Sequence, residues 1–138
     1  MIDDIAAQVR LRRGQVVTVE LAGPDASRLC DELDIALDDG REPYVYFVLG
    51  RACRTREQAA VHFTAALRLP YAAAAGWDEF LIALGAGAAS ARTCVVVADA
   101  QELLADDPEA RADLLIHLPS GPHCLGGGWT TLVLATGG

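Results

Sequence analysis

Two adjacent carboxylates, Asp78 and Glu79, lie near the start of a short segment that reads GWDEFLIAL. They fall in the first turn of a predicted helix, where the positive end of the helix dipole favours negative charge. Ile82 lies off the apolar stripe of this helix, so we expect it to face solvent or a partner. These side chains are therefore suited to the recognition of a partner through charge and apolar contact. The stripe itself has the spacing i, i+3, i+4, i+7 and consists of Trp77, Phe80, Leu81 and Leu84.

Residues typical of catalysis or metal binding do not form a recognisable motif. The histidines, His62, His117 and His123, are far apart, and the four cysteines contain no C-x-x-C pair. A nucleophilic site built from Ser120, His123 and Cys124 has no supporting pattern. We therefore predict a protein that is not an enzyme and has no cofactor or metal. A small α/β enzyme stays open as an alternative, which a ligand-sized pocket near Gly50 and Asp99 would support.

Charge and hydropathy narrow the class of partner. The chain has 138 residues, a net charge of −8 and 11 arginines without a lysine. Seven acids lie in residues 25–42 and six in residues 99–113. Such surfaces repel nucleic acid and attract basic proteins, although they also serve simply to keep a protein in solution. No apolar run is long enough to span a membrane and the first residues do not resemble a secretory signal, so we expect a cytoplasmic protein with reduced cysteines.

The elements that must position these side chains alternate along the chain. Thr55 and Gln58 form one predicted capping box, Asp99 and Glu102 form another, and Pro108 is placed to open a helix. The run YVYFVL at 44–49 predicts a strand buried on both faces, as in a parallel sheet. The order favours an α/β fold with a small parallel sheet in one domain, residues 1–138. Strands are expected at 15–21, 44–49, 93–98 and 129–135, and helices at 25–38, 55–68, 77–84, 99–105 and 107–118.

From Tyr44 onward, this order resembles the barstar family of ribonuclease inhibitors. The local match lies in the loop and helix that follow the first strand-helix unit of that family. It consists of Leu69-Pro70, Trp77-Asp78, Phe80 and Leu84. The resemblance implies three parallel strands packed with helices. Residues 1–43 then form an N-terminal strand-helix extension, whose strand at 15–21 we expect to add a fourth strand to the sheet.

The resemblance also implies a function, because the family inserts this loop and helix into the active site of a ribonuclease. It suggests an inhibitor or immunity protein that blocks a basic toxin, a ribonuclease, with the partner-binding residues Tyr71, Asp78, Glu79, Leu81 and Ile82. Asp78 matches a family aspartate, whereas Ile82 stands where the second, central aspartate would be. Ile82 is then either part of an exposed apolar patch with Leu81 or is covered by the N-terminal unit. The alternative function is an interaction module without inhibitor activity, which binds either another protein or a second copy of itself.

The loop before the helix departs from the family as well. Four alanines, residues 72–75, replace an aromatic-glycine loop, and Gly76 replaces the usual asparagine. Because alanine favours helix, we expect this loop to be helical and to lengthen the helix at 77–84 backward.

Overall fold

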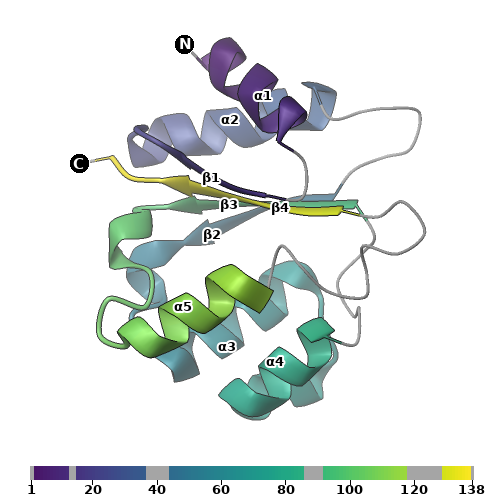
Figure 1. Cartoon of the computed structure of the whole chain (residues 1–138), viewed down its shortest axis with the longest axis vertical. Coiled ribbons are helices and arrows are strands. Elements are labelled where there is room, and N and C mark those ends of the chain that lie inside the picture. Colours follow the sequence, from purple (N-terminus) through teal and green to yellow (C-terminus); the bar gives the residue numbers. More distant parts are fainter. Residues whose placement is uncertain (1, 13–14, 37–43, 86–91, 118–128, 138) are drawn as a thin grey trace.

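The computed structural model describes residues 2–12, 15–36, 44–85, 92–117 and 129–137. Its centre is a four-stranded, all-parallel sheet in the order β1-β4-β3-β2. Helices α1 and α2 cover one face, and α3, α4 and α5 cover the other (Figure 1). The predicted α/β class and the added N-terminal strand are confirmed. The strands are β1 (Val16–Val19), β2 (Tyr44–Leu49), β3 (Arg92–Ala98) and β4 (Trp129–Ala135), and the α-helices are α1 (Ile2–Leu11), α2 (Gly23–Ala36), α3 (Arg56–Leu67), α4 (Trp77–Gly85) and α5 (Pro108–His117).

The central strand β3 divides the interior into two cores. Val95 and Val97 face α3, α4 and α5, whereas Cys94 and Val96 face α1 and α2. All four are fully buried, as expected for a parallel strand covered on both faces. The N-terminal extension therefore builds a second core of its own on the side of the sheet away from α4.

The strand β2 differs from its prediction. It lies at an edge of the sheet, and Phe47 and Leu49 are 38% and 40% exposed. Burial on both faces was wrong because hydrophobicity alone does not fix the order of strands in a sheet. In the described part of the chain, no helix is both long and apolar enough to cross a membrane.

Capping motifs in the sequence predicted some helix starts correctly and others wrongly. Thr55 and Gln58 form the predicted capping box, and the Asp107 carboxylate accepts a hydrogen bond from the Ala110 amide at the start of α5. The prediction that Asp99 caps a helix is wrong. Its backbone is left-handed, with φ 50°, and its side chain accepts no capping hydrogen bond from the turn that follows. The helix expected at 99–105 contracts to a single 3₁₀ turn, η3 (Ala100–Glu102).

The alanine loop is helical, as expected, but it does not extend α4. Residues Tyr71–Ala75 form a 3₁₀ helix, η2, and Gly76 then adopts an extended backbone with φ −179° and ψ 173°. The Gly76 carbonyl accepts the first helical hydrogen bond of α4, from Phe80 N at 3.0 Å. The two helices are therefore separate units joined at Gly76.

Candidate functional site

Helix α4 is held in place by its aromatic side. The Phe80 ring lies 5.2 Å from the Trp77 ring and 6.1 Å from the Phe63 ring of α3, measured between centroids. Phe80 and Leu84 are fully buried and Trp77 is 6% exposed. Because these rings pack against both α3 and each other, the orientation of α4 about its own axis is fixed.

The opposite side of α4 faces solvent. Asp78 and Glu79 are exposed, Ile82 is 71% exposed, and Leu81 is half-buried at the edge of the core. Residues 78 and 82 are one helical turn apart, so the Asp78 carboxylate and the Ile82 side chain are neighbours on this surface. The structure thus places four of the five predicted partner-binding residues along one side of one helix.

The N-terminal unit does not cover Ile82. Helices α1 and α2 pack on the far face of the sheet, whereas α4 lies with α3 and α5 (Figure 1). The alternative in which Ile82 belongs to a core is therefore wrong. The interpretation as part of an exposed patch agrees with the 71% exposure of its side chain.

Tyr71, the fifth residue, begins η2 and is 93% exposed. The turn is anchored by Ala73, which is buried and donates its amide to the Pro70 carbonyl at 2.9 Å. Since η2 packs against both α3 and α4, the exposed aromatic side chain is carried by a supported turn.

The Glu79 carboxylate has a local role as well. Its Oε2 atom lies 2.6 Å from where a Cβ at position 76 would stand. The side chain therefore folds back over the N-terminus of α4, where a negative charge is favoured. Gly76 leaves room for this arrangement, and any larger residue there would push the carboxylate outward.

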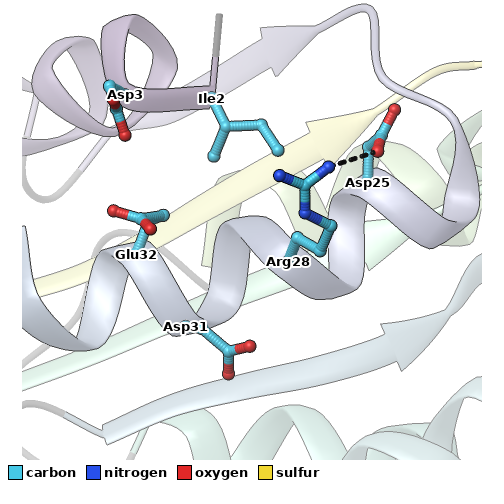
Figure 2. Close-up of a pocket in the computed structure, with 6 residues that line it drawn as sticks. All are labelled: Ile2, Asp3, Asp25, Arg28, Asp31 and Glu32. Carbon is cyan, nitrogen blue, oxygen red and sulfur yellow. Dashed lines mark hydrogen bonds and ion pairs between the residues drawn. The ribbon is translucent and has the colours of Figure 1, made fainter.

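The acidic stretch in residues 25–32 lies on the α1–α2 face. A cavity of about 370 Å³ between the two helices is lined by four carboxylates, one cation, Arg28, and the apolar side chain of Ile2. Figure 2 shows Arg28 turned toward Asp25, 3.4 Å away, while Asp3 on α1 lies across from Glu32 on α2. These charges are on the side of the sheet opposite α4, so they act on a partner at α4 only through the long-range field. Among the described residues no group of acids, histidines and cysteines could hold a metal ion.

The second acidic stretch is largely paired within the protein. Arg54 contacts Glu102 at 2.5 Å and Asp106 at 3.0 Å, and Arg56 contacts Asp107 at 2.5 Å. The hydrogen bond from Arg56, together with the Ala110 amide, lowers the pKa of Asp107. These ion pairs join the segment after β2 to the segment after β3. The charge of this stretch therefore serves the fold and is less available to a partner than its sequence suggests.

A cavity of about 430 Å³ does open where β2 and β3 end. It is lined by Gly23, Pro24, Phe47, Leu49, Arg51 and Asp99, with the Arg51 Nε atom 3.9 Å from an Asp99 oxygen. This is the place at which an enzyme of this fold class would bind its substrate. The described lining residues offer no hydroxyl, thiol or imidazole, and the one carboxylate among them, that of Asp99, lies beside the Arg51 guanidinium.

The described cysteines are free thiols whose pKa values are raised above the ordinary value. Burial raises the pKa of Cys53 to about 11 and, with the nearby Asp31 and Asp34, that of Cys30 to about 12. Burial also raises the pKa of Cys94. Thiols of this kind are poor nucleophiles at neutral pH. The other catalytic candidates, Ser120, His123 and Cys124, lie outside the described residues.

No family model, no curated protein and no solved structure matches this chain. The features of this chain that bear on its function are the residues of α4 and η2 and the order of the elements around them.

Proposed function

We propose that this chain is an inhibitor that binds a cationic protein toxin through α4 and η2 and blocks its active site. The observation that carries the proposal is the division of α4 into two sides. Trp77 and Phe80 lock one side into the core, while Asp78 and Ile82 stand exposed on the other. A rigid helix that presents a carboxylate beside an apolar side chain loses little conformational entropy when it binds.

A ribonuclease is the class of toxin that the resemblance to barstar supports. The active site of a ribonuclease must be cationic to hold phosphates, so an exposed carboxylate such as Asp78 complements it. The net charge of −8 would also raise the rate of encounter with a basic partner. Tyr71, at 93% exposure, supplies an aromatic side chain of the type that dominates interface energetics.

Inhibition in this mode is steric and needs no cofactor or covalent step. The helix occupies the cleft, Asp78 pairs with a cation of the toxin, and Ile82 packs against its wall. Because Ile82 replaces the family's central aspartate, we expect the matching position of the toxin to be apolar where its relatives are cationic. A partner selected in this way would discriminate against inhibitors that carry a charge at that place.

The alternative function is a protein-interaction module without inhibitor activity. Ile82 favours it, because a 71% exposed isoleucine in place of a carboxylate is better suited to an apolar partner than to a phosphate-binding site. Both functions use the same surface, but only an inhibitor blocks the active site of its partner. One assay of enzyme activity therefore separates them.

The test is an RNA-cleavage assay with small, basic, secreted bacterial ribonucleases, including any encoded beside this gene. We expect stoichiometric inhibition by the wild-type protein and about tenfold weaker binding for Asp78→Asn, with a reduced dependence on salt. Full burial of an isoleucine contributes about 1.5–3 kcal/mol. Since 71% of the Ile82 side chain is still available for contact, Ile82→Ala should reduce the free energy of binding by about 1–2 kcal/mol. This corresponds to a rise in Kd of roughly 5- to 30-fold.

Leu11→Ala is the matched control, because Leu11 is 85% exposed on α1, away from α4. It should leave inhibition unchanged. If no ribonuclease of the panel is inhibited, the inhibitor proposal is wrong. Binding without inhibition, still sensitive to Ile82→Ala, would instead establish the interaction module.

A further inference from the structure

The cavity at the carboxyl ends of β2 and β3 is a second candidate binding site, separate from α4. Its volume of about 430 Å³ falls within the range of roughly 300–1,000 Å³ that is typical of small-molecule sites. In parallel sheets with helices on both faces, ligands bind at the carboxyl ends of the strands. The structure describes every lining residue and the neighbours of each in the chain. The cavity is therefore complete enough for its ligand to be argued from its walls.

Two turns carry the charged groups of this cavity. Arg51 lies in the 3₁₀ turn η1 (Gly50–Ala52), directly after β2, and Asp99 directly follows β3. The Leu104 amide donates a hydrogen bond of 2.6 Å to the Cys53 carbonyl, which joins the two turns. The backbone beneath both charges is therefore positioned before a ligand arrives, and this lowers the cost of binding.

The two charges face each other without a hydrogen bond between them. The Arg51 Nε atom lies 3.9 Å from an Asp99 carboxylate oxygen, which is beyond hydrogen-bond distance. A guanidinium has five N–H donors and a carboxylate can accept several hydrogen bonds. Both groups therefore keep the capacity to bind a ligand that lies alongside them.

The balance of charge favours a ligand that carries both signs. The cavity is lined by one cation and one anion, so a ligand with a net charge meets one group of its own sign. The net charge of −8 on the chain disfavours a simple anion further. A separation of 3.9 Å also suits a zwitterion whose charges are close together, as in an α-amino acid, better than one whose charges are separated by a long chain.

The remaining walls are apolar or open. Phe47 and Leu49 lie two residues apart on one face of β2 and are 38% and 40% exposed, and Pro24 lines the cavity from the start of α2. At Gly23, beside Pro24, a Cβ would have nothing within 4 Å. An apolar side chain of the ligand would therefore have room and would cover two half-exposed apolar residues.

We propose that this cavity binds a free apolar α-amino acid of the size of leucine or phenylalanine. The carboxylate of the ligand pairs with Arg51, its ammonium group pairs with Asp99, and its side chain packs against Phe47 and Leu49. Binding is reversible and involves no covalent step. Because the Arg51 side chain is 67% exposed, solvent weakens its ion pair, and we expect a Kd on the order of 100 µM. The inference is independent of the proposed inhibitor function, because it uses a different surface.

Titration of the full chain with L-phenylalanine and L-leucine, followed by calorimetry and ¹H–¹⁵N NMR, tests the proposal. At about pH 6.5 both charged groups of the amino acid are ionised. We expect saturable binding with shifts in the amides of residues 49–52 and 98–100. N-acetyl-L-phenylalanine, which lacks the ammonium group, and L-phenylalaninamide, which lacks the carboxylate, should bind at least tenfold more weakly, as should L-glutamate and L-lysine. If neither apolar amino acid binds, or if any of these four compounds binds as tightly, the proposal is wrong.

Variants of the protein locate the site. Arg51→Gln and Asp99→Asn should each weaken the binding of L-phenylalanine at least tenfold, and asparagine tolerates the left-handed backbone of position 99 as well as aspartate does. Arg28→Gln is the matched control, because Arg28 is similarly exposed, at 72%, and pairs with Asp25 beside a different cavity. It should leave binding unchanged. Unchanged binding in both site variants, or an equal loss in Arg28→Gln, would overturn the proposal. If a variant fails to fold, the compounds tested on the wild-type protein still decide it, and the inhibitor proposal is unaffected by any of these results.

Discussion

Phe80→Ala tests the orientation of α4, on which the whole candidate site depends. Phe80 is fully buried and its ring lies against those of Trp77 and Phe63, at centroid distances of 5.2 and 6.1 Å. Truncation of a buried phenylalanine costs about 3–5 kcal/mol through lost transfer energy and the cavity left behind. The two ring contacts put the expected cost near the middle of this range or above it, at about 4 kcal/mol.

The assay is thermal and urea unfolding, followed by circular dichroism and tryptophan fluorescence. For a domain of this size, a loss of about 4 kcal/mol should lower Tm by roughly 10–15 °C. Ile82→Ala, on the exposed side of the same helix, should change the free energy of unfolding by less than about 0.5 kcal/mol. If Phe80→Ala cost less than about 1 kcal/mol, or Ile82→Ala cost as much as Phe80→Ala, then α4 would present a different side and the site would have to be redrawn.

Three further predictions concern charge, close packing and thiol chemistry. The folded pKa of Asp107 is lowered, so its contribution to stability is complete above the unfolded value of about 3.9 and is lost as the pH falls through the folded value. Asp107→Asn, which keeps a capping side chain, should therefore flatten the fall in Tm between about pH 5 and pH 2; an unchanged slope would contradict this assignment. Gly50→Ala should destabilise by about 1–3 kcal/mol in urea unfolding, because its Cβ would overlap the backbone oxygens of Asp99 and Ala98. Gly23→Ala, where the space is open, should be nearly neutral, and equal costs would refute the steric reason. Mass spectrometry of alkylated peptides should show protection in the native state at pH 8, lost in denaturant, for Cys30, Cys53 and Cys94.

The local sequence was sufficient where a short-range pattern determined the structure. The Thr55–Gln58 box and the proline at position 108 mark the starts of α3 and α5 because caps act within one turn. Helix α1 was not predicted, although its sequence carries another local signal, the spacing of its apolar residues. Ile2, Ile5, Ala6 and Val9 have the spacing i, i+3, i+4, i+7 and form the inner side of α1.

Other features depend on contacts that no local pattern encodes. The Asp99–Glu102 spacing satisfies the capping rule, yet Glu102 pairs with Arg54, 48 residues away. Gly50 packs against the Asp99 backbone and Leu104 donates its amide to the Cys53 carbonyl. These tertiary contacts hold the segment after β3 in a left-handed turn, and they outweigh the local preference for a helix. The position of β2 at the edge is of the same kind, since strand order follows from the connections between distant elements.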